Sequence, residues 1–365
     1  MPAFPHSTAR AQTTSVPEAL ALPVIEQAFP RHRHEYWPKL QVESRAWLLE
    51  KRLMPADKVT RYADELRYTD LIAGYYVGAP KDVISAISDF STWFFVWDDQ
   101  HDRDAVHGRR TAWYRLSAEL HTALDDPGDH LAHPEPLVAA FAETVHRLNG
   151  FLSPAWNERF ARHFHAIVGA YDQEFENRVT KVTPKVAEYI ELRRHTFGHS
   201  VWIDLLEPTA GREIPTALRT SGPFLAAARH CQDFSAWYND LCSLPKELAG
   251  DDQHNLGISL IRHEGLSLEE AVVEVRKRVE NCVTEFEVAE KELRELLAGH
   301  LAALPGGAGT AEARSVAEAV GSAVFNMRNW FSSVYWFHHE SGRYRVDSWD
   351  DRSTPPYVSD LAGDA

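Results

Sequence analysis

The sequence predicts an all-α protein with one domain and a bundle-like core. Apolar residues recur three and four positions apart nearly throughout the chain from residue 39, as they do on one face of a helix. No stretch of convincing length alternates apolar and polar residues in the manner of a strand. The length of 365 residues is compatible with two domains, but no interior linker is long enough to separate two cores.

The chain has a long helical region between two polar ends. Residues 1–20 are rich in Ala, Thr, Ser and Pro, lack periodicity, and are predicted to be disordered. We expect the folded domain to cover residues 21–347, beginning with an irregular segment at 29–38 whose aromatic residues pack on the helices. Residues 348–365 are predicted to form a polar, proline-containing tail.

Prolines and glycines divide the domain into helices, because proline removes a backbone donor and both residues punctuate local structure. The breaks fall at Pro55, Pro80, Pro127-Gly128, Pro134, Pro136, Pro154, Pro184, Pro208 and Gly211, and at the loop 305–309. The predicted helices are 39–53, 57–76, 80–99, 108–124, 135–149, 154–178, 185–206, 214–249, 254–263, 267–302 and 312–340.

The predicted helix at 80–99 ends among aromatic and acidic residues. Asp98, Asp99 and Asp102 cluster at its C-terminal end, because positions three and four apart share a helical face. Carboxylates at a helix C-terminus oppose the macrodipole unless a cation compensates them. Mg2+ commonly binds through one or two carboxylates plus substrate phosphates. The stretch therefore predicts a metal-binding wall rather than a solvated acidic turn.

A second set of oxygen ligands lies on the predicted helix at 214–249. Asn239, Ser243 and Glu247 are four residues apart, so their side chains share one stripe of the helix. An amide, a hydroxyl and a carboxylate suit a hard cation. Lys246 lies beside them and is placed to meet an anion carried by the metal. The stripe therefore predicts a second metal-binding wall.

Composition excludes several classes of function. The net charge is 38 − 53 = −15, which argues against nucleic acid or an anionic membrane as a partner. No segment approaches the roughly 18 apolar residues of a membrane span, and no secretory signal is visible. The cysteines, Cys231, Cys242 and Cys282, form no pairable framework. We expect a cytoplasmic protein.

Together the two walls resemble the paired motifs of class I terpene cyclases, and the chain is most similar to bacterial sesquiterpene cyclases. The aspartate-rich DDxxD is 98–102 and the NDxxSxxxE is 239–247. The C-terminal W-x6-RY signature is formed by Trp336, Arg343 and Tyr344. The resemblance implies a single-domain class I α-bundle around a central active-site cavity that lies between the two metal faces.

The resemblance also implies a lyase that consumes farnesyl diphosphate. Three Mg2+ ions are expected, with Asp98 bridging two of them and Asn239, Ser243 and Glu247 holding the third. The expected reaction is metal-triggered ionisation and cyclisation to a polycyclic sesquiterpene hydrocarbon plus diphosphate. The protein is expected to be a monomer or a homodimer.

The diphosphate and the cation have their own expected contacts. By similarity, diphosphate is bound by Arg193, Lys246, Arg343 and Tyr344, the family's spacing selecting Arg193 over its neighbour Arg194. The aromatic lining of the pocket corresponds to Phe94, Phe95, Phe197 and Trp202. On an unbroken helix Trp202 would lie opposite Arg193, so both face the pocket only if the helix breaks near Gly198, which glycine permits.

Three other classes compete with cyclisation. A chain-elongating prenyltransferase remains an alternative, but it would normally carry a second aspartate-rich motif in place of 239–247. A di-iron carboxylate bundle usually needs two ExxH pairs, and Glu143 with His146 is the only one here. A helical interaction protein would explain the periodicity but not the two oxygen-ligand walls.

Overall fold

The computed structural model describes residues 23–344 and confirms the all-α fold. Within this range the chain forms helices and turns and contains no strand. The helices are α1 (Trp37–Glu50), α2 (Ala56–Thr60), the π-helix η2 (Arg61–Glu65), α3 (Tyr68–Tyr75), α4 (Lys81–Val106), α5 (Arg110–Asp125), α6 (Pro136–Asn149), α7 (Pro154–Thr180), α8 (Val186–Thr196), α9 (His199–Asp204), α10 (Leu206–Ala210), α11 (Thr216–Arg219), α12 (Gly222–Ala249), α13 (Leu256–Glu264), α14 (Leu268–Ala303), the 3-10 helix η3 (Gly307–Gly309), α15 (Ala311–Glu340) and the 3-10 helix η4 (Gly342–Tyr344). The predicted terminal segments 1–20 and 348–365, and the expected domain limits at 21 and 347, lie outside the described residues.

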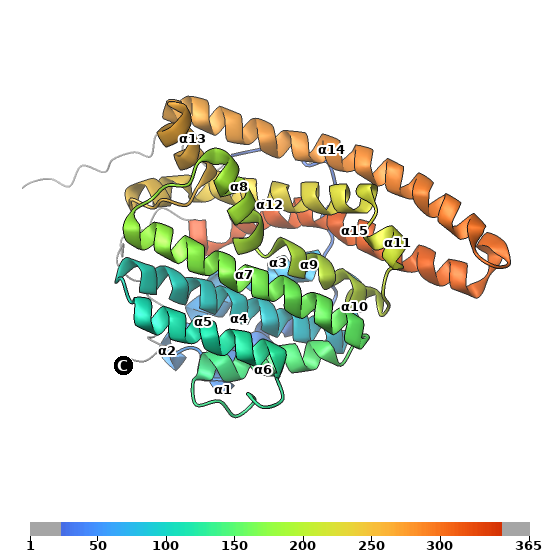
Figure 1. Ribbon diagram of the computed structural model, residues 1–365, viewed down its shortest axis with the longest axis horizontal. Helices are drawn as coiled ribbons and strands as arrows, with labels where there is room; N and C mark the ends of the chain where they lie inside the picture. The colour runs from blue at the N-terminus through green and yellow to red at the C-terminus, as the bar shows by residue number, and fades with distance from the viewer. Residues whose placement is uncertain (1–22, 345–365) are drawn as a thin grey trace, which may run out of the picture.

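The helices form two stacked groups. In Figure 1, α12, α14 and α15 lie above α4, α5, α6 and α7, and the hairpin of α14 and α15 projects beyond the rest of the bundle. α12 packs on both α14 and α15, whereas α4 packs on α6 and α7, and α3 joins the groups by packing on α4 and α15. The two helices that carry the predicted metal-binding walls, α4 and α12, therefore belong to different groups.

Aromatic side chains fix α4 in its orientation. Trp93 and Trp97 are fully buried, with ring centroids 5.4 Å apart. Trp93 packs against Phe141 of α6 at 4.4 Å, and Trp97 packs against Phe164 of α7 at 5.9 Å. Aromatic side chains bury large apolar areas and dominate core energetics. Because successive helical residues are turned by about 100°, this packing directs Asp98 away from the core.

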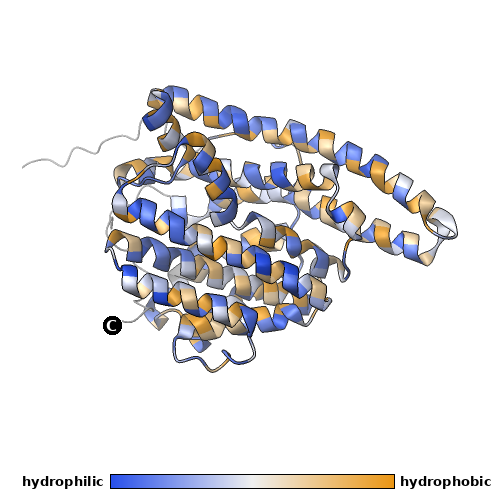
Figure 2. Cartoon of the chain, viewed as in Figure 1, coloured by the Kyte–Doolittle hydropathy of each residue, from blue (hydrophilic) through white to orange (hydrophobic). Residues whose placement is uncertain are grey.

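The longer surface helices are amphipathic. Figure 2 shows hydrophilic and hydrophobic residues alternating in patches along α14 and along the lower helices.

The predicted packing of the segment at 29–38 is confirmed, because the ring of Phe29 lies 5.8 Å from Phe286 and 5.3 Å from Phe331. No helix within residues 23–344 combines the length and the apolar character that crossing a bilayer requires.

The prediction of one helix over 57–76 is wrong in its middle. The chain passes from α2 into η2 and then turns at Arg67, whose φ is 58°. The Arg67 guanidinium donates to Asp70 Oδ2 at 2.9 Å, and Arg33 donates to the same oxygen at 2.9 Å. The contact between Arg33 and Asp70 joins residues far apart in the chain, and the local helical pattern does not reveal it.

The predicted end of the third helix at 99 is also wrong, because α4 continues to Val106. Gln100 donates to Asp104 Oδ1 one turn later at 3.0 Å, and the Arg109 guanidinium lies 3.1 Å from the same oxygen. Asp98 therefore lies inside the helix. The helix macrodipole therefore does not favour a cation at Asp98, but the burial of the Asp98 carboxylate does.

Two further boundaries differ from the prediction. The helix predicted over 214–249 is divided into α11 and α12 by Ser221, whose hydroxyl accepts from the Phe224 N–H at 3.4 Å as an N-cap. Pro208 was expected to mark a break between helices. It lies instead in the first turn of α10, where a backbone N–H would have no helical partner.

Candidate active site

One residue from each predicted wall, Asp98 and Asn239, lines a shared cavity of ≈ 110 Å³. Among the sequence-predicted residues, those of its polar end are Asp98, Arg193, Asn239, Arg343 and Tyr344. Its apolar lining includes Leu71, Ile72, Phe94, Phe95, Phe197, Trp202, Val334 and Phe337. The cavity is therefore polar where α4, α8 and α12 approach the end of the described chain, and mainly apolar, with many aromatic rings, elsewhere.

On the α4 wall, Asp98 and Asp99 are held by donors from elsewhere in the fold. Tyr171 of α7 donates its hydroxyl to Asp98 Oδ1 at 2.9 Å. The guanidinium of Arg343 lies 3.3 Å from Asp99 Oδ1 and 3.6 Å from Asp98 Oδ2. Burial, and next the like charge of Asp102, raise the pKa of Asp98. Burial also raises the pKa of Asp99 to about 7, although Arg343 opposes it.

On the α12 wall, Asn239 is the centre of the hydrogen bonding. Its Oδ1 accepts from Arg193 at 2.7 Å, and its Nδ2 donates to the Tyr344 hydroxyl at 2.8 Å. The Ser243 hydroxyl donates to the Asn239 carbonyl at 2.9 Å. α12 continues through Pro245 to Ala249, so the stripe predicted from the four-residue spacing is intact.

Glu247 is a predicted ligand whose pKa is strongly raised. Its Oε2 accepts from Asn255 Nδ2 at 2.6 Å. Burial, and next the charges of Asp252 and Asp240, raise its pKa to about 8. A carboxylate held in this way is expensive to ionise without a nearby cation. The position therefore favours a cation near Glu247.

Not every predicted residue reaches the cavity. Ser243 and Glu247 lie further along the stripe from Asn239, and Lys246 is exposed beside them. Asp102 turns instead to α7, where Arg178 contacts its Oδ1 at 2.7 Å. Burial raises the pKa of Asp102, but Arg178 and His101 oppose this more strongly, so the pKa is lowered overall.

The predicted break at Gly198 is present. α8 ends at Thr196, Gly198 has a φ of 77°, and α9 begins at His199. The break lets the Arg193 guanidinium, 5.0 Å from the Phe197 ring centroid, and Trp202 line the same cavity. Two further contacts complete the aromatic lining: Phe94 lies 5.2 Å from Trp202, and Phe95 stacks on Tyr68 at 3.7 Å.

Sequence reasoning missed several polar residues of the site. Tyr171 and Asn255 hold predicted metal ligands, and His338 lines the cavity with its Nδ1 donating to the Val334 carbonyl at 2.7 Å. None of them belongs to a motif whose spacing marks it. Only the helical periodicity that places Tyr171 on the inner face of α7 was available as a signal.

Comparison with known proteins decides the family. Residues 89–285, which include both walls, match the family described as "Terpene synthase family 2, C-terminal metal binding". The chain is 62% identical over 363 residues to epi-isozizaene synthase of Streptomyces coelicolor, a match that covers 99% of each chain. The chain belongs to the terpene synthase family. The predicted family and fold are therefore confirmed.

More distant proteins are similar to this terpene synthase in sequence or in fold. Pristinol synthase of Streptomyces pristinaespiralis is 29% identical over 273 residues, covering 74% of this chain and 72% of its own. Among solved structures, α-eudesmol synthase aligns with a TM-score of 0.73 at 22% identity, covering 88% of this chain and 100% of its own. A cucumene synthase variant aligns with a TM-score of 0.71 at 23% identity, with the same coverages.

The oxygen atoms of the two predicted walls suit a hard divalent cation. The family is a metal-binding one, and the walls offer carboxylate, amide and hydroxyl oxygens, the ligand types that Mg2+ prefers. The raised pKa values of Asp98 and Glu247 show that burial opposes the ionised carboxylates. An adjacent cation would relieve that opposition. The residues present therefore fit the metal that the family binds.

Metal affinity is expected to rise with pH. Glu247 is a predicted metal ligand, and ligation by its carboxylate would require the ionised form, whereas its pKa of about 8 leaves it protonated at neutral pH. Raising the pH from about 6.5 to about 7.5 should therefore strengthen Mg2+ binding by up to about tenfold. The same shift makes the metal-free fold lose stability as the pH rises from 4.5 to about 8, because the folded state retains a proton that the unfolded chain releases.

Isothermal titration of Mg2+ into the protein at several pH values measures this dependence. Asp252→Asn is the matched variant, because the charge of Asp252 raises the pKa of Glu247. Its affinity profile should move to lower pH. Superimposable profiles for the two proteins would contradict the assignment of Glu247.

Proposed function

We propose that this terpene synthase is a sesquiterpene cyclase that ionises farnesyl diphosphate and cyclises the cation to epi-isozizaene, releasing diphosphate. The observation that carries the proposal is one cavity that has residues of α4 and α12 at its polar end and a largely apolar remainder rich in aromatic rings. The 62% identity to epi-isozizaene synthase, extending over 99% of both chains, supports the choice of product.

We propose that three Mg2+ ions act in this reaction. Asp98 would hold two of them from α4, and Asn239, Ser243 and Glu247 would hold the third from α12. Bound Mg2+ supplies a Lewis acid that stabilises negative charge on a leaving diphosphate. The two walls belong to helices from different halves of the bundle, so a diphosphate between them would be gripped from both sides.

The proposed diphosphate donors are Arg193, Lys246, Arg343 and Tyr344. In this structure Arg193 and Tyr344 are both bonded to Asn239, and Arg343 lies against the aspartates of α4. Donors already in place need little reorganisation when charge develops on the leaving group, which is the main source of electrostatic catalysis. Lys246 is exposed, and its side chain would reach the diphosphate from the rim.

The aromatic lining protects and stabilises the allylic cation. Phe94, Phe197 and Trp202 are brought to the same cavity by α4 and by the break at Gly198. Aromatic faces stabilise cations by about 2 kcal/mol or more each when desolvated. They offer no nucleophilic oxygen, and a closed apolar cavity excludes the water that would quench a reactive intermediate.

Phe95→Ala is expected to keep substrate consumption within a few-fold of the parent and to shift the products towards early-quenched hydrocarbons or alcohols. Phe95 lines the cavity and stacks on Tyr68 at 3.7 Å, so its loss opens space and removes about 2 kcal/mol of cation stabilisation. Gas chromatography–mass spectrometry measures the profile. Phe325→Ala, which removes an exposed ring from α15, is the control, and equal profiles for the two variants would count against the role of Phe95.

The proposed function itself is tested with purified protein, farnesyl diphosphate and Mg2+. We expect one major sesquiterpene hydrocarbon that co-elutes with epi-isozizaene. A chain-elongating prenyltransferase would instead need isopentenyl diphosphate, and a helical interaction protein would release no diphosphate. Product formed only when isopentenyl diphosphate is added would overturn the proposal.

A cytoplasmic location and a monomer or homodimer complete the proposal. The location is supported by Cys231, Cys242 and Cys282, which are buried as free thiols, as suits a reducing compartment. Sedimentation of the full chain measures the oligomeric state.

A further inference from the structure

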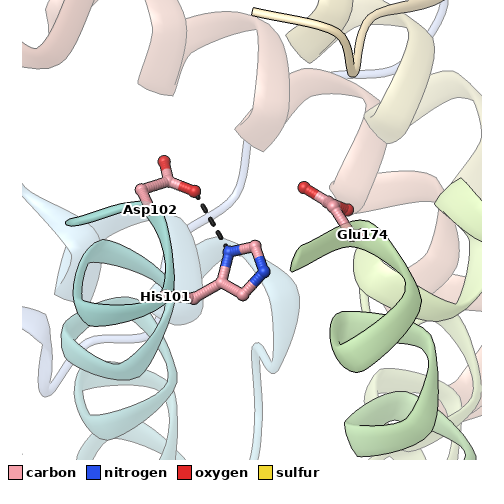
Figure 3. Close-up of side chains that lie close together, drawn as sticks. All are labelled: His101, Asp102 and Glu174. Atoms are coloured by element: carbon pink, nitrogen blue, oxygen red, sulfur yellow. Dashed lines mark hydrogen bonds and ion pairs between the residues drawn. The ribbon is translucent and has the colours of Figure 1, made fainter. Parts of the chain in front are cut away.

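Three potential metal ligands lie outside the cavity, between α4 and α7. They are His101 and Asp102 on α4 and Glu174 on α7, and their ligand atoms all lie within 4.8 Å of one another. Figure 3 shows Asp102 and His101 on one helix and Glu174 on the neighbouring helix, with the imidazole between the two carboxylates. His101 is fully buried and Glu174 is 4% exposed. The three residues are called the α4–α7 cluster below.

Two polar contacts orient the ring of His101 in this cluster. Its Nε2 lies 3.2 Å from the Tyr171 carbonyl, which only accepts, so Nε2 carries a proton. Its Nδ1 lies 3.2 Å from Asp102 Oδ1. Nδ1 is therefore the ring nitrogen that faces the carboxylate of Asp102. Metal-binding histidines show this arrangement, with the other N–H donated to a carbonyl.

The guanidinium of Arg178 already contacts both carboxylates. Arg178 Nη1 donates to Asp102 Oδ1 at 2.7 Å, and Nη2 donates to Glu174 Oε1 at 2.9 Å. A third carboxylate, Asp252, lies 3.3 Å from Nη1. One guanidinium therefore faces three carboxylates, and its Nη1 shares Asp102 Oδ1 with His101. The side chain of Arg178 is only 17% exposed, so water screens these charges weakly.

The two outer aspartates of the DDxxD motif consequently differ in their surroundings. Asp98 lines the cavity and has a neutral tyrosine hydroxyl at 2.9 Å and its nearest guanidinium at 3.6 Å. Asp102 points to α7 and has a guanidinium at 2.7 Å. We propose that the α4–α7 cluster could bind a divalent cation, and that the guanidinium of Arg178 takes the place of that cation. Arg178 thereby confines metal ions to the Asp98 side of the motif. The proposal rests on the proposed function only for metal binding at Asp98.

Arg178→Met tests the proposal, because it removes the charge and keeps an unbranched side chain. The probe is Mn2+, which accepts both imidazole and carboxylate ligands, titrated without diphosphate. Electron paramagnetic resonance of free Mn2+ and isothermal titration should both find one more ion bound per chain than in the parent. Arg178→Lys, which retains a cation, should bind the parental number.

Glu174→Gln provides the matched control in two backgrounds. Combined with Arg178→Met, it should abolish the additional ion. Alone, it should leave the parental number of ions unchanged, because Glu174 binds Arg178 rather than a metal. A folded Arg178→Met protein that binds no additional Mn2+, or an ion lost in the single Glu174→Gln variant, would overturn the proposal. The titrations contain no farnesyl diphosphate, so their result and the result of the product assay are independent.

Discussion

Asn239→Ala is expected to lower turnover of farnesyl diphosphate by at least about 10²–10³ while leaving the protein folded. Asn239 supplies a proposed metal-ligand oxygen and also links two diphosphate donors, since Arg193 donates to its Oδ1 and its Nδ2 donates to Tyr344. Alanine removes both functions from a partly exposed position on α12. Asp98→Ala, on the opposite wall, should have an effect of the same size.

The rate is measured as diphosphate released, and folding as far-ultraviolet circular dichroism and thermal unfolding. Asn281→Ala is the control, because Asn281 is exposed on α14 outside the cavity. It should retain the parental rate. Near-normal rates in Asn239→Ala or Asp98→Ala would reject the metal assignment.

Gly198→Ala is expected to lower the free energy of unfolding by about 2 kcal/mol and to redistribute the products. The φ of 77° at Gly198 is unfavourable for alanine. The added Cβ would also lie 2.7 Å from Trp202 Nε1, so the indole must move. It would lose the bond that it donates to the Phe197 carbonyl at 2.9 Å, and two of the aromatic lining residues would shift together.

Gly265→Ala separates the effect of the backbone conformation from the effect of the contact with Trp202. Gly265 has a similar φ of 71°, but nothing lies within 4 Å of the added Cβ. We therefore expect about 1 kcal/mol of destabilisation from the backbone alone and an unchanged product profile. Urea unfolding and product analysis compare the variants. Equal loss of stability with unchanged products in both would show that the approach of Trp202 to Gly198 does not shape the pocket.

The helical periods were sufficient to predict the all-α fold, and the motif spacings predicted which oxygen-bearing side chains share a face of α4 and of α12. The stripe of Asn239, Ser243 and Glu247 depends only on the helical repeat, and α12 preserves it. The break at Gly198 was also predictable, because two residues expected at one pocket could not otherwise face it. Such features are local, so neighbouring residues in the chain determine them.

One of the boundaries that failed lies beside partners distant in the chain. Arg67 interrupts the helix predicted over 57–76 next to Asp70, which also binds Arg31 and Arg33 from another segment, and no local pattern reveals these contacts. The partners of the three aspartates in the acidic motif also could not be read from the sequence. Spacing placed Asp98, Asp99 and Asp102 together, but did not distinguish them.

The sequence by itself therefore determined an all-α protein with two oxygen-bearing helices, since residue spacing on a helix decides which side chains share a face. The resemblance of its motifs added the terpene synthase family. Only the tertiary structure decided what each carboxylate meets. Asp98 faces a cavity with Tyr171, whereas Asp102 faces Arg178. Both partners come from α7, whose position depends on the packing of the aromatic core. Burial then sets the charge of each group, because the free energy of an ion depends on the groups that replace its water.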